Sequence, residues 1–460
     1  MNKIPYFECD DKAVNDAFRL AIGCVAANVA TIKSGILKRE EPCVMAGIGY
    51  ANPWTRDAAI NVYNAVALLN PVVAKNTLYA VLNETDGKIC IGDQYWDKII
   101  WAIGASKLYL VNRDKEFLKF AYSTILNTLR QLEYDEYDDE TGLFRGAAVY
   151  GDGISAYPEK YRKMNGKVPV TCVLDWVKAY PDEAVKRGYG LPMETLSTNC
   201  VYKKAYDILA FAAKELGENP DEFELKSQKL KNAINERFWN EKTGLYDYLY
   251  NECDAQEGLG LAFAVLFGIA DEKKAESIAK NAYSTRYGLP CVYPCFKPYD
   301  LYQGGGHYGR HCGTIWPQVQ GFFAMAMLKS GYKKRFDDEF FALTKNAVRD
   351  KQFVEIYHPD TGLPYGGIQE WENEFIEWGA ENYQTWCATA YLNMVVEGIV
   401  GLSVGQGVRF NPYLPRGINY ASLKNLYIGD TRYDIEIKRG SGECVRKEDE
   451  EIYKYTIYIK

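Results

Sequence analysis

Apolar residues recur every three to four positions along most of the chain between residues 11 and 400, which is the period of amphipathic helices. Within this region, short turns alternate with long loops that are rich in glycine and aromatic residues. Because each short turn joins two successive helices, the pattern predicts helical hairpins that close into a ring. The twelve expected helices cover residues 11–32, 56–69, 72–83, 93–110, 114–132, 197–216, 222–238, 257–268, 273–282, 314–330, 336–349 and 381–400.

A turn motif of the form polar-Thr-Gly-Leu follows three of the odd-numbered predicted helices, in DDETGLF, NEKTGLY and HPDTGLP. Glycine in such a tight turn favours positive φ, which other residues adopt at a cost. If the motif marks the end of every second helix, those ends lie on one side of the ring. The starts of the even-numbered helices then face the same side.

Those starts differ in chemistry from the rest of the helices. They read NPWTRDAAI, GDQYWDKII, LSTNCVYKK, GTIWPQVQG and ENYQTWCAT, whereas the later turns of the same helices are apolar. Converging helix N-termini also bring positive dipole ends together, which favours carboxylates nearby. We therefore predict that the functional site lies at this mouth of the ring.

After residue 404 the period becomes two. NLYIGDTRYDIEIKRG and YKYTIYIK alternate apolar and polar residues, which predicts antiparallel strands. We expect a helical domain at residues 1–403 and a small β appendix at residues 404–460 that stabilises the fold or acts as a lid.

Composition excludes several classes of function. The net charge is −7 and no basic cluster is present, which argues against a nucleic-acid partner. The longest apolar run, GLGLAFAVLFGIA, is too short to span a bilayer, and the N-terminus lacks a signal-peptide pattern, so we expect a cytoplasmic protein without a membrane partner. Only 3 histidines are present, and we expect no metal site and no cofactor.

The aromatic content of 14%, with 37 tyrosines, favours a ligand with apolar faces and polar edges, as sugars have. Asp57 can accept hydrogen bonds from sugar hydroxyls, Arg56 can donate them, and a sugar ring can stack on Trp54. The other expected substrate-binding residues are Tyr95, Trp96, Tyr150, Asn199, His307, Trp316, Trp378 and Glu381, with Trp371 and Trp386 as further walls.

These motifs resemble known glycosidases. WTRDAA resembles the sugar-binding segment of glucoamylase-type enzymes in glycoside hydrolase family 15. Two further segments, NAINERFWNEKTGLYDY and GTIWPQVQGFFAMAM, resemble segments of families 63 and 37. Glycogen-debranching glucosidases carry motifs of the same kind. All are six-hairpin glycosidases, so the resemblance implies an all-α fold, an (α/α)6 toroid, with the β appendix after it.

The resemblance implies that Asp152 is a general acid, because families 63 and 37 carry an acidic residue in the loop after the fifth helix. VYGDGISAYP occupies the equivalent place. A general acid must hold its proton near neutrality, and we expect walls such as Tyr150 and Tyr157 to raise the pKa of Asp152 by disfavouring the charged form.

The resemblance also implies a general base, and Glu355 in FVEIYHPDTGLPYGG is the candidate. Trehalases place a glutamate in a similar context, although this chain has Ile rather than Lys between the Glu and the Tyr. Glu372, Glu377 and Glu381 are rivals for this role. Two carboxyls on opposite walls of the mouth are expected about 6.5–9.5 Å apart, which leaves room for a water and gives inversion.

The sequence therefore predicts an exo-acting, inverting α-glycosidase that removes a terminal, glucose-like sugar from an oligosaccharide or small glucoside. An α-L-rhamnosidase or a glycoside phosphorylase on the same barrel is an alternative. A sugar epimerase is disfavoured by the scarcity of histidine, and a non-catalytic sugar-binding protein is a further alternative. Related enzymes usually carry an additional domain that supplies part of the pocket wall. In this protein a second copy of the chain, in a homo-oligomer, is one way to supply that wall.

Overall fold

Six helices contact one another in a closed circuit in the computed structural model, which describes residues 4–92, 95–162, 171–297, 299–371, 374–449 and 452–459. These inner helices, in circuit order, are α2 (Thr55–Asn61), α5 (Trp101–Asn112), α9 (Leu196–Leu216), α11 (Gly258–Leu266), α13 (Pro317–Lys329) and α15 (Thr385–Asn393). Each contacts the next, and α15 contacts α2 again. They are the even-numbered helices of the sequence prediction.

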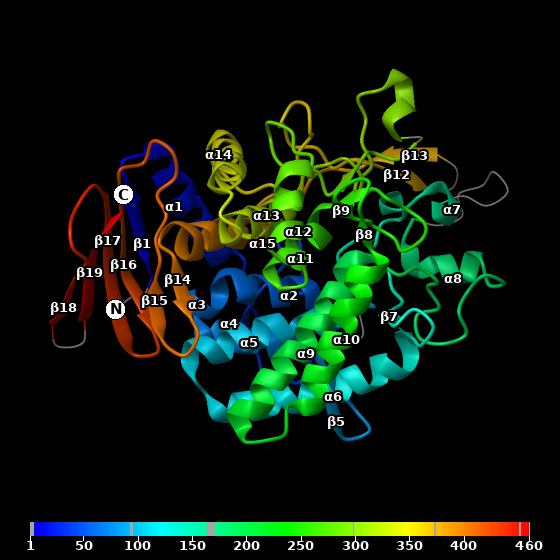
Figure 1. Ribbon diagram of the computed structural model, residues 1–460, viewed down its shortest axis with the longest axis horizontal. Coiled ribbons are helices and arrows are strands. Elements are labelled where there is room, and N and C mark those ends of the chain that lie inside the picture. Colours follow the sequence, from blue (N-terminus) through cyan, green and yellow to red (C-terminus); the bar gives the residue numbers. More distant parts are fainter. Residues whose placement is uncertain are drawn as a thin grey trace.

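A second set of helices lies outside this circuit and alternates with it along the chain (Figure 1). The outer helices are α1 (Lys12–Ala27), α4 (Pro71–Tyr79), α6 (Lys115–Glu136), α10 (Asp221–Arg237), α12 (Glu272–Asn281) and α14 (Lys333–Asp350). Among other contacts, α10 packs on α9 and α14 packs on α13. Inner helices are apolar over most of their surface, whereas outer helices bury one stripe, as α12 does with Ala275, Ile278 and Ala279.

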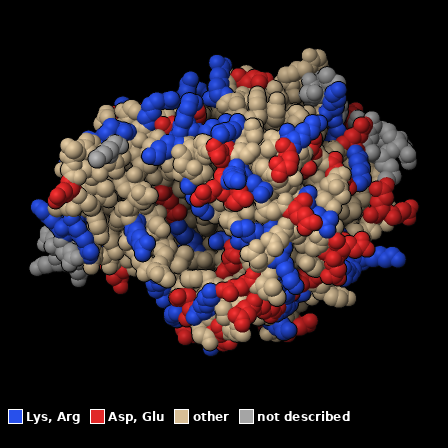
Figure 2. Space-filling model, in the orientation of Figure 1, with Lys and Arg blue, Asp and Glu red and all other residues tan. Residues whose placement is uncertain are grey.

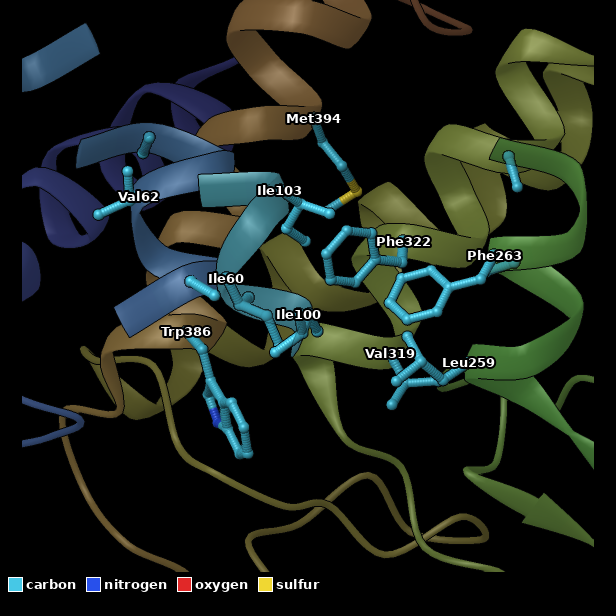
Figure 3. Packing of buried hydrophobic residues seen from close by; sticks show 14 of the residues in the cluster. Ile60, Val62, Ile100, Ile103, Leu259, Phe263, Val319, Phe322, Trp386 and Met394 are labelled. Carbon is cyan, nitrogen blue, oxygen red and sulfur yellow. The ribbon is translucent and has the colours of Figure 1, made fainter. Parts of the chain in front are cut away.

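The centre of the circuit is packed with side chains. Figure 3 shows Ile103, Phe263 and Phe322, from three inner helices, and Met394, from the π-helical turn that follows α15, pointing toward one another. The rings of Phe263 and Phe322 meet edge to face with centroids 5.1 Å apart. Because this core fills the middle of the circuit, a ligand can enter only from an end.

The three polar-Thr-Gly-Leu turns share one conformation, as the sequence predicted. Gly142, Gly244 and Gly362 have φ of 73°, 69° and 70°. In each turn the glycine N–H donates to the carbonyl four residues earlier, at 2.8, 2.8 and 2.9 Å. The repeated motif is therefore a repeated structural unit.

Several predicted helices are shorter than expected. The first ends at Ala27, where Asn28 turns the chain and donates from Nδ2 to Thr385 Oγ1 at 2.8 Å, and Val29–Ile32 forms a strand. The fourth begins at Trp101 after a 3-10 turn at Lys98–Ile100. Residues 95–97, just before this turn, are not helical, so their side chains can point into the mouth of the ring.

The C-terminal strands form a five-stranded sheet in the order β1 (Tyr6–Cys9), β16 (Tyr420–Ile428), β17 (Thr431–Arg439), β19 (Ile452–Ile459) and β18 (Val445–Asp449). The expected antiparallel pairing is found between β1 and β16, β16 and β17, and β18 and β19, but β19 runs parallel to β17. The chain leaves β17, forms the edge strand β18, and returns between them as β19. The sheet lies beside α1, and both termini lie at it (Figure 1). It also takes β1 from the N-terminus, and the boundary at residue 404 stays a prediction.

The remaining elements are short. Within the described residues, seven pairs of strands form two-stranded antiparallel sheets. In the first half of the chain these are β2 (Val29–Ile32) with β3 (Glu41–Val44), β4 (Leu82–Thr85) with β5 (Lys88–Ile91), and β6 (Tyr137–Asp138) with β7 (Leu143–Phe144). In the second half they are β8 (Trp239–Asn240) with β9 (Leu245–Tyr246), β10 (Gln256–Glu257) with β11 (Val292–Tyr293), β12 (Ile368–Trp371) with β13 (Glu374–Glu377), and β14 (Leu402–Val404) with β15 (Val408–Phe410). Short helices are α3 (Ala67–Leu69), α7 (Glu159–Arg162) and α8 (Trp176–Ala179), and π-helical turns extend α2 (Val62–Val66) and α15 (Met394–Ile399).

Acidic and basic side chains are intermixed over the face of the molecule in Figure 2. Within the described part of the chain, no helix has the length and apolar character that crossing a bilayer requires.

Candidate active site

A pocket of about 320 Å³ lies where the inner helices begin, and it contains both carboxyls that the sequence singled out, Asp152 and Glu355. The loops after β7 and α14 supply these two residues. Predicted site residues that also line the pocket are Trp54, Arg56, Asp57, Tyr95, Tyr150, Trp316 and Trp378, with the predicted wall Trp386. Segments more than two hundred residues apart in sequence thus meet in one cavity.

The backbone is held in an unfavourable conformation at two lining residues. Trp54 has φ of 45° and Tyr150 has φ of 58°, a region that non-glycine residues rarely occupy. Such positions cost on the order of 1–3 kcal/mol and persist where the surrounding structure fixes them. Here they direct two aromatic side chains at the pocket.

Asp152 is surrounded by groups that stabilise its ionised form. The Tyr95 hydroxyl donates to Oδ2 at 3.1 Å, and Arg56 Nη2 lies 3.5 Å from the same oxygen. His311 Nε2 lies 3.5 Å from Oδ1. Arg56 also approaches Asp97, with Nε 3.7 Å from Oδ2, and its guanidinium lies over the Tyr95 ring at 4.3 Å.

The pKa of Asp152 is consequently lowered, which corrects the expectation that its surroundings raise it. Burial raises this pKa, but Arg56, His311, the backbone N–H of Asp152 and the Tyr95 hydroxyl together outweigh burial. Sequence reasoning identified the aromatic neighbours but not the cation beside the carboxyl. Tyr157 lies behind the loop rather than against Asp152, and accepts the Ala148 N–H at 3.0 Å.

The neighbouring acids behave differently. Burial raises the pKa of Asp57 to about 7, since Arg56 compensates only in part and Glu355 adds repulsion. Burial likewise raises the pKa of Asp97 to about 6, against the effect of Arg56. Asp97 Oδ2 accepts the Tyr150 N–H at 3.3 Å and so also fixes the loop that carries Asp152.

Glu355 is 2% exposed and accepts three hydrogen bonds. Arg310 Nη2 donates to Oε2 at 2.8 Å, the Glu381 N–H donates to Oε2 at 3.3 Å, and Gln384 Nε2 donates to Oε1 at 3.4 Å. Burial raises the pKa of Glu355, and Arg310 and the Glu381 N–H oppose it. All three partners are donors, which fits a carboxylate that accepts.

Aromatic rings form the floor between the two carboxyls. Tyr150 lies 5.1 Å from Trp316, and Trp316 lies 5.9 Å from Trp386, measured between ring centroids. His311 stacks on Trp316 at 5.0 Å with an interplanar angle of 22°. Such a floor suits the apolar face of a sugar ring, while the carboxyls suit its hydroxyl edges.

The structure places four predicted substrate-binding residues outside the lining of this pocket. Trp96 is fully buried in the core beside Tyr95, because consecutive residues there point in opposite directions. Asn199 is also fully buried, and its amide pairs with the Phe144 backbone, donating at 3.0 Å and accepting at 2.8 Å. His307 is partly buried away from the pocket, and the exposed Glu381 contributes its backbone rather than its carboxyl. Glu372 and the side chain of Trp371 lie outside the described residues.

Several residues that line the pocket, or that lie behind its lining as Asp97 does beside Arg56, were missed from the sequence. Asp97 stands in GDQYWDKII, a predicted helix start, but Asp there also fits a simple helix cap. His311 lies four residues after His307 in GGGHYGRHCG, where no periodicity indicates which histidine points inward. Gln384 precedes α15 and resembles an ordinary polar residue before a helix. Among the described residues, no group of three or more His, Cys, Asp or Glu side chains is placed to hold a metal ion.

The sequence profile of the mannosylglycerate hydrolase MGH1-like glycoside hydrolase domain matches residues 50–386. A mannosylglycerate hydrolase of Rubrobacter radiotolerans is 23% identical over 229 residues, which are 48% of this chain and 47% of that protein. The chain therefore matches about half the length of this curated relative.

Two solved structures share the fold. A sialidase has a TM-score of 0.64 at 15% identity, covering 93% of this chain and 38% of the sialidase chain. A family 63 mannosylglycerate hydrolase of Thermus thermophilus, solved with glucose, has a TM-score of 0.60 at 17% identity, covering 82% of this chain and 98% of that chain. The profile match and this structure confirm the resemblance to six-hairpin glycosidases, family 63 included.

A buried ion pair ties together the loops that surround the pocket. Arg162 Nη1 donates to Glu370 Oε1 at 2.6 Å, and both side chains are 2% exposed. Arg162 Nε donates to the carbonyl of Tyr157 at 2.9 Å, and the Tyr299 hydroxyl donates to Glu370. Glu370 follows Gln369, which lines the pocket, so this pair connects the loop of Asp152 to β12.

We expect Arg162→Met to lower the free energy of unfolding by about 3–5 kcal/mol, because it leaves Glu370 buried and charged without its partner. The double variant Arg162→Met/Glu370→Met should be less destabilised than the single variant, since no unpaired charge remains. Denaturant unfolding of both proteins measures this difference. A single variant as stable as the wild type, or a double variant that is worse than the single one, would contradict the assignment.

Proposed function

Since the chain belongs to the mannosylglycerate hydrolase MGH1-like glycoside hydrolase family, we propose that this glycoside hydrolase is an exo-acting, inverting α-glycosidase with Asp152 as general acid and Glu355 as general base. The observation that carries the proposal is the presence of both carboxyls in one pocket, over an aromatic floor. Figure 3 shows apolar side chains filling the centre of the circuit, which supports a pocket that opens at one end and takes a terminal sugar rather than an internal one.

The finer description of the fold belongs to the same proposal. The closed circuit of α2, α5, α9, α11, α13 and α15 is the inner ring of an (α/α)6 toroid, and α1, α4, α6, α10, α12 and α14 form its outer ring. This arrangement explains why the inner helix starts, and with them Arg56, Asp57, Trp316 and Trp386, gather at one mouth.

In the proposed reaction, the sugar lies on Trp316 and Trp386, and Asp152 protonates the departing oxygen. The bond from the anomeric carbon to this oxygen breaks, and its electron pair stays on the oxygen. A water on the other face attacks the anomeric carbon and loses a proton to Glu355. Inversion requires the two carboxyls to be about 6.5–9.5 Å apart, so that this water fits between Glu355 and the sugar.

Each carboxyl's surroundings support its role. The hydrogen-bond donors on Glu355 favour the ionised form, which can accept a proton, against the burial that raises its pKa. The Asp152 side chain is 29% exposed, and a bound sugar would cover this face. Covering it removes water and raises the pKa of Asp152, so the acid becomes protonated in the complex rather than in the free enzyme.

The terminal sugar is proposed to be glucose-like, on a small glycoside or oligosaccharide. Mannosylglycerate is the second candidate substrate, because the curated relative is named for its hydrolysis. Arg310 supports this candidate in part: its guanidinium lines the pocket 5.5 Å from the exposed ring of Trp378, but it is paired with Glu355 at 2.8 Å, so an acidic aglycone would share this cation with Glu355. A rhamnoside is the remaining substrate to include in a screen, together with α-glucosides and α-mannosides.

We expect Asp152→Asn and Glu355→Gln each to lower kcat by about 10²–10⁴, the usual contribution of a general acid or base. Glu381→Gln is the matched control, because the Glu381 carboxyl is exposed and only its backbone N–H binds Glu355. Steady-state kinetics on the preferred glycoside, with and without phosphate, measures the effects. A loss in Glu381→Gln that equals the loss in Glu355→Gln would assign the base to Glu381, and turnover that requires phosphate would assign phosphorolysis.

We expect the pH profiles of kcat/KM and of kcat to differ at their alkaline ends. Activity needs Glu355 ionised and Asp152 protonated at the same time. In the free enzyme cations lower the pKa of Asp152 and burial raises the pKa of Glu355, so Asp152 sets the acidic limb of kcat/KM and Glu355 sets its alkaline limb. Bound sugar raises the pKa of Asp152 above that of Glu355, so Asp152 then sets the alkaline limb of kcat, which should lie at higher pH than the alkaline limb of kcat/KM. Coincident alkaline limbs would rule out this protonation on binding.

A further inference from the structure

We infer that Asp152 carries its transferable proton on Oδ1 and that His311 is the positioning residue for this proton. The inference rests on the proposed function and goes beyond it by assigning one oxygen of the acid and the side chain that aligns its proton. Its basis is the unequal surroundings of the two oxygens of Asp152.

The Oδ2 side of Asp152 faces donors. The Tyr95 hydroxyl donates to Oδ2 at 3.1 Å, and Arg56 Nη2 lies 3.5 Å from it. A guanidinium has five N–H donors and no acceptor, and it stays charged at any pH at which the protein is folded. A proton on Oδ2 would face the N–H groups of Arg56, which cannot accept it. The proton of neutral Asp152 therefore belongs on Oδ1.

The neighbour of Oδ1 is an imidazole, whose Nε2 lies 3.5 Å away. The pKa of His311 is lowered to about 3, mainly by burial, with Arg310 and Arg56 adding to the effect and Asp152 opposing it. A neutral imidazole has one nitrogen that donates and one that accepts. His311 can therefore donate to ionised Oδ1 or accept from protonated Oδ1, which a guanidinium or an ammonium group cannot do.

His311 is held in one place by contacts that do not involve Asp152. Its ring stacks on Trp316 with an interplanar angle of 22°, and its backbone N–H donates to Ser155 Oγ at 3.2 Å. Gly153 permits the close approach, because a Cβ at this position would lie 2.4 Å from Nδ1 of His311. The imidazole is 5% exposed and its loop joins the pocket through Arg310 as well.

These contacts define the path that the proton takes during the reaction. Protonated Oδ1 is aligned by Nε2 of His311 and then gives its proton to the glycosidic oxygen as the bond to the anomeric carbon breaks. The carboxylate that remains is stabilised by Arg56 and Tyr95 at Oδ2. The water that attacks loses its proton to Glu355, so the imidazole ends each turnover neutral.

The test is the dependence of His311→Phe on the leaving group. Phenylalanine keeps a ring to stack on Trp316 but removes both nitrogens. With the α-glycoside of an aliphatic alcohol, which leaves only when protonated, we expect kcat to fall about 10²-fold, within the range of acid catalysis. With the matching α-glycosyl fluoride, which leaves as fluoride without a proton, kcat should stay within about threefold of the wild type, since acid catalysis is not needed.

Two further variants make the result decisive. His358→Phe is the matched substitution at a histidine that packs on Tyr308 and Tyr365, and it should change both substrates to the same extent. Asp152→Asn should show the same split between substrates as His311→Phe, but larger. If Asp152→Asn shows the split and His311→Phe slows both substrates equally, His311 has a structural role and the inference is wrong. If Asp152→Asn itself shows no split, the proposed acid is wrong.

Discussion

The proposed acid depends on one buried cation, the guanidinium of Arg56. It lies between Asp97 and Asp152 and over the Tyr95 ring, and its side chain is 7% exposed. Burying a guanidinium is unfavourable unless opposite charges and hydrogen-bond acceptors surround it, and removing one partner of such a group usually costs several kcal/mol. Because Asp97 also accepts the Tyr150 N–H, the same ionic group fixes the backbone that leads to Asp152. The Arg56–Asp97 pair therefore fixes the position of Asp152, and Arg56 also influences its charge.

The two carboxyls are prepared in different ways for different tasks. Glu355 is almost fully buried in the pocket wall and held by donors from three residues, an environment that orients the carboxyl as a base. Asp152 keeps one face open to the mouth, so its charge responds to what binds there. In the proposed mechanism the substrate itself completes the acid, and this explains how a carboxyl beside a cation can still donate a proton. His311 lies against the oxygen of Asp152 that Arg56 does not approach, where such a proton would reside.

Sequence periodicity predicted the alternation of inner and outer helices and the glycine turns at Gly142, Gly244 and Gly362, because burial and backbone conformation leave local patterns. The mouth was also predictable, since polar and aromatic residues at otherwise apolar helix starts are conspicuous, whereas the two carboxyls, Asp152 and Glu355, were implied by the resemblance to known glycosidases. The lowered pKa of Asp152 was not predictable, because it arises from Arg56 and His311, which lie far from it along the chain. The same limit explains why Trp96 was placed in the pocket: neighbouring residues of a non-helical segment point in opposite directions, and only tertiary contacts show which one faces the ligand. The parallel pairing of β17 with β19 likewise depends on chain routing rather than on local alternation.

Asp152 and Glu355 are proposed to act from opposite sides of one sugar, and the anomer that is released first tests this most directly. Proton NMR can follow the hydrolysis of an α-glycoside from the first turnovers, before the released sugar mutarotates. We predict that the β-anomer appears first, in wild-type protein and in any Asp152 or Glu355 variant that retains activity. Release of the α-anomer would mean retention, which requires carboxyls only about 5–5.5 Å apart and a covalent intermediate, and would contradict the proposed roles of both residues.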